Sequence, residues 1–184
     1  MFNGDATDES GNHDATSSSG ITYSAGKDGD AAFSDSDASY IDISSISLSD
    51  FTYSFWAKVN TSASSNITMM KEVGMDSYWI MIRSGGVNKF LIRIGASGTV
   101  STVNYSPTGN FDHYVVTRDD DHLEMYINNV RVINNTSCPT TSMQVERLNN
   151  STDYVEDAPE AIDQMRIFNR GITSSEVATL YNEV

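Results

Sequence analysis

Residues 161–183 constrain the fold more than any other stretch, because a strand, a turn and a helix follow one another there, each with its own signal. In an extended chain alternate residues share a face, so Met165 and Ile167 lie on one face with Asp163 at its edge. If that face is buried, the Asp163 carboxylate needs a cation or several hydrogen-bond donors, because uncompensated burial costs several kcal/mol or more. The strand therefore predicts a charged or polar partner for Asp163 at the edge of the core.

A short helix is predicted directly after this strand. Asn-Arg-Gly at 169–171 ends the strand, and Thr173 followed by Glu176 forms a capping box, in which each side chain bonds the backbone N–H of the other residue. Three apolar residues then fall at helical spacing on one side: Val177, Leu180 and Tyr181. A helix of about two to three turns is not stable alone, so we expect it to pack as a lid on a sheet.

Upstream of these residues the chain consists of short β-type runs separated by Ser, Thr, Asn, Asp and Gly. The clearest strand is 51–59, with Tyr53 and Phe55 on one face and Trp56 on the other, which predicts a central strand covered on both sides. Shorter runs predict strands at 31–33, 40–43, 67–72, 78–83, 89–94, 114–118, 123–127 and 143–148. Roughly a dozen strands with one helix and no βαβ alternation predict a single all-β domain over residues 1–184, a sandwich of two antiparallel sheets.

The formal net charge of −14 comes from 25 acidic residues against 11 basic ones. This charge disfavours nonspecific binding to nucleic acid or to an anionic membrane and favours binding of cations. We expect no nucleic-acid partner and no membrane insertion, since no apolar run approaches the length of a membrane span. The single cysteine, Cys138, rules out an internal disulfide, so stability comes from packing, with a bound metal as a further source.

The N-terminal stretch FNGDATDESGNHDATSSSG is almost free of apolar residues and is predicted to be a loop. Its Asp and Asn side chains and its backbone carbonyls offer oxygen ligands, which favour a hard cation such as calcium. The spacing resembles an EF-hand superficially, but the required glycine and the closing glutamate are out of register. From composition alone a solvated acidic loop is the stronger interpretation, because such charge runs are usually surface.

Five segments in order resemble laminin-G-like domains of the concanavalin A-like lectin/glucanase superfamily: FNGDATDESGN, AAFSDSDASYIDI, FTYSFWAKV, FDHYVVTRDDDHLEMYINNVRV and AIDQMRIFNRGITSSEVATLYNE. The resemblance covers essentially the whole chain and implies a jelly-roll sandwich, often with a bound calcium, in proteins that adhere to glycans or to other proteins. There are three departures from the family pattern. Only Met1 precedes the F-N-G segment, which begins at Phe2, where the family has a strand. Phe111 stands where the family has tryptophan, and 128–129 is Asn-Asn rather than Asn-Gly.

Carried over residue by residue, the family's metal site places its early aspartate on Asp8, its asparagine on Asn12 and its late aspartate on Asp163. The two ends of the chain would then meet at one calcium ion, which would account for a carboxylate at the edge of the core. Asp5 or nearby backbone oxygens would complete the roughly six to eight ligands that calcium prefers. The resemblance thus raises a structural calcium site above the solvated-loop interpretation.

The sequence does not predict an enzyme. The glucanases of the superfamily need paired carboxylates in an E-x-D-x-x-E strand, and no such run occurs in this sequence. The acidic residues at 156, 157 and 160 have the wrong spacing, and a proline interrupts them. The histidines at 13, 113 and 122 have no nucleophile at a suggestive spacing, and we interpret each as a satisfied or exposed side chain.

The favoured function is a calcium-stabilised, lectin-like adhesion module that recognises carbohydrate, a glycan or polysaccharide, on a cell surface. An aromatic ring stacked on a sugar face, with hydrogen bonds from Asp, Asn and Arg, would provide the binding. Trp79 is the candidate platform, with Arg83 and Tyr105 nearby in sequence. The alternative for Trp79 is a place in the core of one sheet, where aromatic residues usually lie.

The alternative function is a structural protein of a virus particle, such as a decoration protein or tail knob of a phage. Residues 2–20 lack the basic and apolar regions of a signal peptide. We therefore expect either a domain of a longer secreted protein or one that leaves its cell by another route, such as a virion released by lysis. The location would be extracellular or the virion surface, and a decoration protein would contact other virion proteins and form symmetric contacts between copies.

Overall fold

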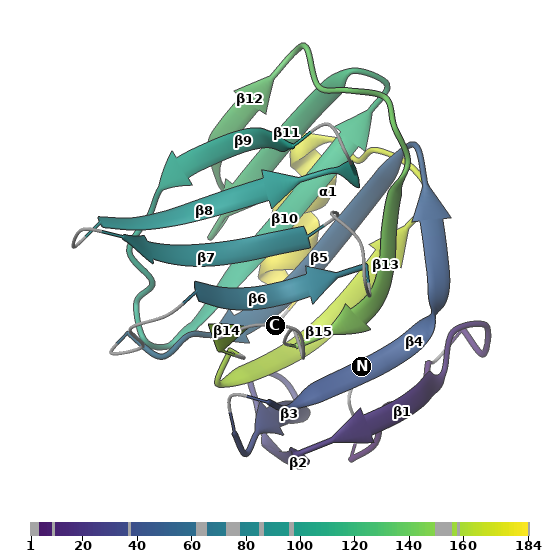
Figure 1. Ribbon diagram of the computed structural model, residues 1–184, viewed down its shortest axis with the longest axis vertical. Helices are drawn as coiled ribbons and strands as arrows, with labels where there is room; N and C mark the ends of the chain where they lie inside the picture. Colours follow the sequence, from purple (N-terminus) through teal and green to yellow (C-terminus); the bar gives the residue numbers. More distant parts are fainter. Residues whose placement is uncertain are drawn as a thin grey trace.

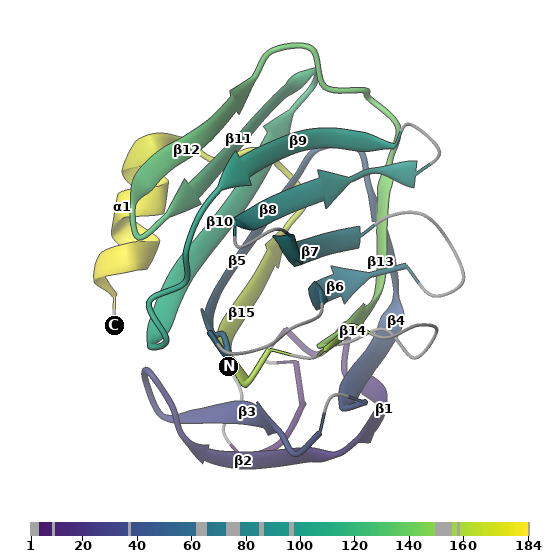
Figure 2. The same ribbon diagram turned by 60° about the vertical axis from the view of Figure 1, so that its left-hand side comes forward.

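The computed structural model describes residues 4–183 apart from 9, 37, 62–65, 73–77, 85–86, 96–97, 150–155 and 158. Two sheets face each other as the layers of a sandwich (Figure 1), and one helix lies outside them (Figure 2). The predicted all-β jelly-roll sandwich with one short C-terminal helix is confirmed.

The first sheet has the strand order β1 (Ala15–Ser19), β4 (Tyr40–Leu48), β13 (Met143–Leu148), β6 (Asn66–Lys71), β7 (Tyr78–Ser84), β8 (Val87–Arg93) and β9 (Thr99–Asn104). The two-residue strand β14 (Glu156–Asp157) adds a parallel pair to β6, in a sheet whose other described pairs are antiparallel.

The second sheet has the strand order β12 (Val130–Asn135), β11 (His122–Ile127), β10 (Phe111–Asp119), β5 (Phe51–Lys58), β15 (Ala161–Phe168), β3 (Asp30–Ser34) and β2 (Ile21–Ala25). Its described pairs are antiparallel throughout. Strand β15, near the C-terminus, thus lies between β5 and the N-terminal strand β3, and this brings the two ends of the chain to the same part of the sheet.

Strand β5 is the middle strand of the second sheet, and its residues from Phe51 to Ala57 are all buried. Tyr53 and Phe55 belong to the core between the sheets. On the opposite face Trp56 stacks on Tyr181 of the helix, with 5.5 Å between the ring centroids. The prediction of a central strand covered on both sides is therefore confirmed.

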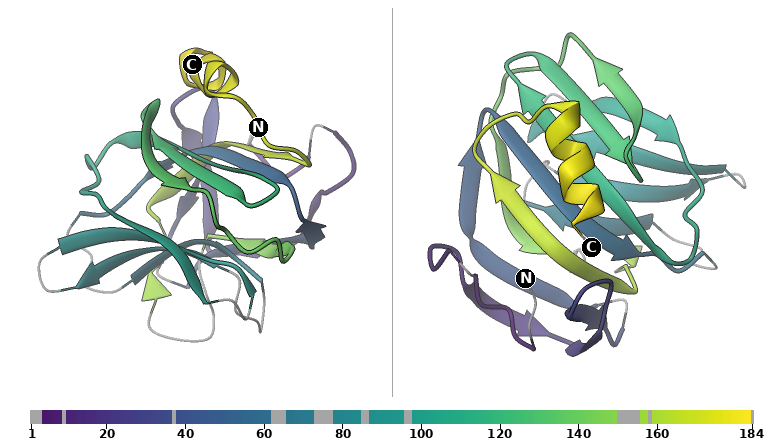
Figure 3. Two further views of the ribbon diagram at one scale, coloured as in Figure 1. Left: turned by 90° about the horizontal axis from the view of Figure 1, so that it is seen from above. Right: turned by 180° about the vertical axis from the view of Figure 1, so that it is seen from behind.

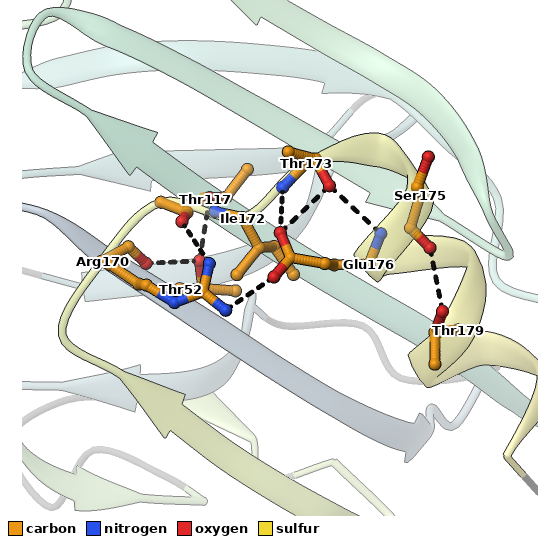
Figure 4. A network of polar contacts seen from close by, with 9 residues as sticks. Thr52, Thr117, Arg170, Ile172, Thr173, Ser175, Glu176 and Thr179 are labelled. Atoms are coloured by element: carbon orange, nitrogen blue, oxygen red, sulfur yellow. Dashed lines mark hydrogen bonds and ion pairs between the residues drawn. The ribbon is translucent and has the colours of Figure 1, made fainter.

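The helix α1 (Ser174–Asn182) begins at the predicted capping box (Figure 4). The Thr173 hydroxyl accepts a hydrogen bond from the Glu176 N–H at 3.3 Å, and the Glu176 carboxylate accepts one from the Thr173 N–H at 2.8 Å. These two bonds satisfy N–H groups that the first turn of a helix otherwise leaves without partners. Propensity and capping alone do not hold so short a helix, so its packing on the sheet decides its stability.

Viewed from behind, α1 crosses the outer face of the second sheet over β5 and β10 (Figure 3, right). Four buried residues form the small apolar cluster beneath it, with Leu180 packed against them: Val115, Tyr126, Ile172 and Val177. The turn before the helix is fixed by Thr117, whose hydroxyl accepts from the Ile172 N–H at 2.9 Å. The predicted lid on a sheet is confirmed.

Five of the described strands were not expected from the sequence, namely β1, β2, β9, β12 and the two-residue β14. Residues 15–19, predicted as part of the N-terminal loop, form β1 instead, because their backbone pairs with β4 although four of the five side chains are exposed. β9 and β12 lie at one end of the sandwich, where the Asn135 amide donates to the Val100 carbonyl at 2.8 Å. In the described part of the chain no helix is long and apolar enough to span a membrane.

Candidate functional site

A cavity of about 380 Å³ opens where the N-terminal loop lies over the edge of the sandwich. The loop (residues 6–13) lines one side, β4 and β13 of the first sheet line the second, and residues 165–168 of β15 line the third. Strand β15 pairs with β3 only through Ala161 and Ile162, whereas its later residues pair with β5 alone among the described strands. The cavity thus lies beside the half of β15 that has a single described strand neighbour.

The floor of the cavity is apolar and reaches the core. Ile41, Ile46 and Leu148 line it, and their side chains are 1%, 8% and 4% exposed. The partly buried lining residues are Ile43 of β4 and Met165 and Ile167 of β15. Most of the wall therefore offers only dispersion contacts and the removal of apolar surface from water.

The polar groups of the cavity come from one side, where the N-terminal loop contributes Thr7, Asp8, Ser10 and His13. The loop is organised around the Asp8 carboxylate, which accepts hydrogen bonds from the Ser10 hydroxyl, from the Ser10 N–H at 3.1 Å and from the N–H groups of Asn12 and His13 at 3.2 and 3.0 Å. The Ser10 hydroxyl, followed by these backbone donors, lowers the pKa of Asp8 to about 2. Asp8 is thus ionised at neutral pH and holds the loop that forms the polar wall.

Arg166 of β15 also lines the cavity. Its backbone pairs with Ser54 on the face of the sheet that α1 covers. Its Nη1 donates to the Glu183 carboxylate at the C-terminal end of α1. The guanidinium has five N–H donors, and it is planar and rigid, so it is suited to hold a ligand hydroxyl or carboxylate while keeping this ion pair. With His13 on the loop, the rim combines hydrogen-bond donors and acceptors above an apolar floor.

Asp163, the carboxylate predicted at the edge of the core, is fully buried. Its Oδ2 accepts from the N–H groups of Lys27 and Asp28 at 2.8 and 3.1 Å, and its Oδ1 accepts from the N–H of Gln164 at 2.7 Å. Lys27 and Asp28 belong to the turn between β2 and β3, and a Cβ at Gly26 of the same turn would lie 2.5 Å from Oδ2. The prediction that several donors meet this carboxylate is borne out by backbone N–H groups.

The four residues predicted to share a calcium ion lie in two arrangements. Asp8 and Asn12 bond within the N-terminal loop, and Asp5 accepts from the Thr7 N–H at 2.9 Å. Asp163 instead bonds the turn between β2 and β3. Among the described residues, no three Asp, Glu, His or Cys side chains form a group that could hold a metal ion. The shared calcium site stays a prediction.

One further oxygen beside Asp163 was not foreseen from the sequence. The Oε1 atom of Gln164 is buried without a hydrogen-bond partner, while its Nε2 donates to the Asp28 carbonyl at 3.0 Å. Gln164 has a positive φ of 50°, a conformation that is uncommon outside glycine. A buried acceptor next to a buried carboxylate is the feature of this region that best suits a hard cation.

Of the three predicted sugar-binding residues, the structure describes the side chain of Tyr105 alone. In β7 the backbone of Trp79 pairs with Ile92 and that of Arg83 with Asn88, but both side chains lie outside the described residues. Tyr105 is partly buried, and its ring meets that of Tyr114 edge-on at 6.2 Å. Burial raises the pKa of the Tyr105 hydroxyl, with Asp112 as a further cause. Tyr105 does not line the cavity, and the role of the three residues as a sugar platform stays a prediction.

A histidine and a serine lie close together under α1 but do not resemble an accessible catalytic pair. The His113 Nε2 is 2.9 Å from the Ser54 hydroxyl, and the two residues are 1% and 2% exposed. The Nδ1 of His113 is buried without a partner, so no carboxylate orients the imidazole as in a nucleophile–base–acid arrangement. We expected His113 to be either fully hydrogen-bonded or exposed, and its buried Nδ1 atom meets neither expectation.

Comparison with known families gives one match, which covers most of the chain. Residues 33–178 match Laminin_G_3, described as the concanavalin A-like lectin/glucanases superfamily. A search of curated proteins found no match.

Solved structures share the fold at low sequence identity. Domain 4 of AbnA, a GH43 extracellular arabinanase from Geobacillus stearothermophilus solved with arabinotriose, has a TM-score of 0.77 and 22% identity over 97% of this chain and 93% of that one. The botulinum neurotoxin serotype D binding domain has a TM-score of 0.63 and 11% identity, covering 94% and 47%. The serotype D ligand binding domain with N-acetylneuraminic acid has a TM-score of 0.59 and 11% identity, covering 88% and 45%. The chain thus spans about half the length of these toxin chains.

Proposed function

Because the chain belongs to the Laminin_G_3 family of the concanavalin A-like lectin/glucanases superfamily, we propose that it is a non-catalytic module that binds carbohydrate. The observation that carries the proposal is the cavity of about 380 Å³, whose apolar walls and polar rim offer both kinds of contact that a sugar uses. Two structures of similar fold were solved with arabinotriose and with N-acetylneuraminic acid, which supports a glycan as the partner. An extracellular location is part of the proposal, in line with the extracellular arabinanase.

Two observations support binding without catalysis. The sequence lacks the paired carboxylates of the superfamily's glucanases. The Ser54–His113 pair is covered by α1, so a substrate would have to displace the helix to reach it. The cavity itself presents one carboxylate, Asp8, which is already occupied by donors of its own loop.

The experiment that tests the function is binding to a broad panel of glycans and polysaccharides, measured once in calcium and once in excess chelator. We expect saturable binding to at least one carbohydrate, weakened by Arg166→Ala because this change removes the cationic group of the rim. Arg131→Ala is the matched control, since Arg131 also pairs with a glutamate, Glu124, but lies on β12 outside the cavity. A folded protein that binds no member of the panel under either condition would refute the proposal.

Calcium enters the proposal as a structural ion held by Asp163, with Asp8, Asn12 and Asp5 as the further ligands that the sequence predicts. It is supported by the fully buried Asp163 carboxylate and by the buried Oε1 of Gln164 that lacks a partner. An ion that binds only the folded state at about one hundred times its Kd adds about 2.7 kcal/mol. For a chain of this size that raises the Tm by roughly 5 to 10 °C.

The calcium proposal is tested by melting Asp163→Asn, Asp8→Asn and a control, Asp121→Asn, with and without calcium. Asp121 is an exposed residue of the turn between β10 and β11. Loss of the calcium response in both Asp163→Asn and Asp8→Asn, but not in the control, would mean that the two ends of the chain share the ion. A full response in Asp163→Asn would show that this residue is not a ligand.

A further inference from the structure

The floor of the cavity is unsuited to the hydroxyl groups of a sugar. Ile41, Ile46 and Leu148 form it. All three are buried, and Ile41 and Leu148 belong to the main core. None of the buried polar side-chain atoms found without a partner among the described residues belongs to a residue that lines the cavity. A hydroxyl placed on this floor would lose its water without gaining a hydrogen bond, at a cost of roughly 1 to 3 kcal/mol judged from mutational data.

The size of the cavity sets the scale of an apolar group that fits. An engineered apolar cavity of about 150 Å³ is enough to bind benzene. The cavity described above has about 380 Å³, so one aromatic ring or a short acyl chain fits on the floor and leaves room toward the rim. The flexible side chain of Met165 at the mouth favours such irregular apolar contacts.

The polar rim lies on two sides of the mouth. His13 and Ser10 on the loop, and Arg166 on β15, supply donors and acceptors there. A ligand that satisfies both parts of the cavity is amphipathic, with an apolar group inside and a hydroxylated ring at the rim.

We infer that the cavity binds the apolar substituent of a modified carbohydrate, an aryl or acyl group on a sugar, while the sugar ring stays at the rim. This inference rests on the proposed carbohydrate-binding function and adds the class of ligand to it. The protein then distinguishes substituted from unsubstituted sugars, because only an apolar substituent covers the floor of the cavity and so removes its apolar surface from contact with water. Burying one aromatic ring or acyl chain improves affinity by about tenfold or more.

The test compares methyl and phenyl glycosides of the same pentoses and hexoses by titration calorimetry, with benzyl alcohol as an apolar probe that carries no sugar. The cavity is filled by Ile43→Trp, which places a large side chain at its mouth from the partly buried position on β4. Val130→Trp is the matched control, because Val130 is also β-branched and in a strand but is 63% exposed. If Ile43→Trp does not fold, Ile43→Phe repeats the test with a smaller change.

We expect the phenyl glycoside to bind at least about tenfold more tightly than the methyl glycoside, with the advantage lost in Ile43→Trp and kept in Val130→Trp. Equal affinities for the two glycosides would overturn the inference and leave the proposed function standing. Benzyl alcohol that binds as tightly as the phenyl glycoside, and is lost in Ile43→Trp, would support the apolar subsite and count against carbohydrate recognition. A cavity that takes up neither glycoside nor benzyl alcohol would overturn the inference.

Discussion

The buried imidazole of His113 makes the stability of this protein depend on pH in a predictable way. The residue is 1% exposed, and its ring contacts those of Trp56 and Tyr181, at 4.9 and 5.8 Å from their centroids. Burial, followed by the positive charge of Arg166, lowers the pKa of His113 from 6.5 to about 4, against an opposing effect of Glu183. A proton on Nδ1 would find no acceptor, since that atom is buried without a partner.

Proton linkage gives the sign and the size of this dependence of stability on pH. Between pH 6.5 and 4 the unfolded chain holds a proton on this histidine and the folded protein does not, so the free energy of unfolding falls as the pH falls through this window. From pH 8 to pH 5 the loss is about 2 kcal/mol, and it approaches about 3 kcal/mol near pH 4. Above pH 7 the protonation of His113 no longer lowers the free energy of unfolding.

The assay is urea denaturation of the wild type and of His113→Gln at pH 8, 7, 6 and 5. Glutamine does not titrate, so we expect the wild type to lose about 2 kcal/mol more than the variant between pH 8 and pH 5, even if the variant is less stable throughout. Carboxylates titrate in both proteins and cancel in the difference. His13→Gln, at an exposed position, serves as the control for replacing a histidine by glutamine. An identical pH dependence in the wild type and His113→Gln would refute a depressed pKa at this residue.

Two further predictions concern the ends of the chain. Thr173→Ala removes the capping hydroxyl of α1 and should lower the free energy of unfolding by about 1 kcal/mol in urea denaturation, with the mid-helix Thr179→Ala costing less. The pKa of Asp8 is lowered to about 2 by the donors of its loop, so the stability it gives is present above pH 4 and is lost as the pH falls through 2. Amide hydrogen exchange should therefore show the loop losing protection in acid before β5 does, and simultaneous loss would contradict this.

The sequence was most informative where local signals agreed with the final packing. Strand β5 carries aromatic residues on both faces and is covered on both faces, and the Thr173–Glu176 pair caps α1 as its spacing indicates. Strand β1 shows no such agreement, because the residues ATSSS have no apolar alternation and four of the five are exposed. An edge strand of this kind is held by backbone pairing to β4. Backbone pairing does not require a periodic pattern of apolar side chains, so the sequence does not reveal it.

The candidate site was predictable only in part, for a related reason. The alternation of β15 placed Asp163 at the edge of the face of Met165 and Ile167, but the irregularity after Asp163 changes the alternation, and Asp163 pairs with Trp56 on the face that α1 covers. Its donors come from the backbone of Lys27 and Asp28, and backbone N–H groups are the same whatever the side chain. The cavity also escaped prediction, because Ile41 and Met165 look like ordinary core residues until the fold places β4 and β15 on its two sides. Neither a backbone N–H donor nor a cavity between two sheets is marked by a particular residue type in the sequence.

Strand β15 links the two features from which function is proposed. Its first residues, Ala161 and Ile162, pair with both β3 and β5, whereas Arg166 and Phe168 pair with β5 and line the cavity. The change occurs at an irregularity between Asp163 and Arg166, where Gln164 takes a φ of +50°. A bulge of this kind bends the strand and redirects the side chains that follow it. An ion or a substitution that alters Asp163 therefore acts on the residue that precedes the irregularity. If calcium binds Asp163 as proposed, removing it with a chelator should weaken ligand binding even without contact between the ion and the ligand.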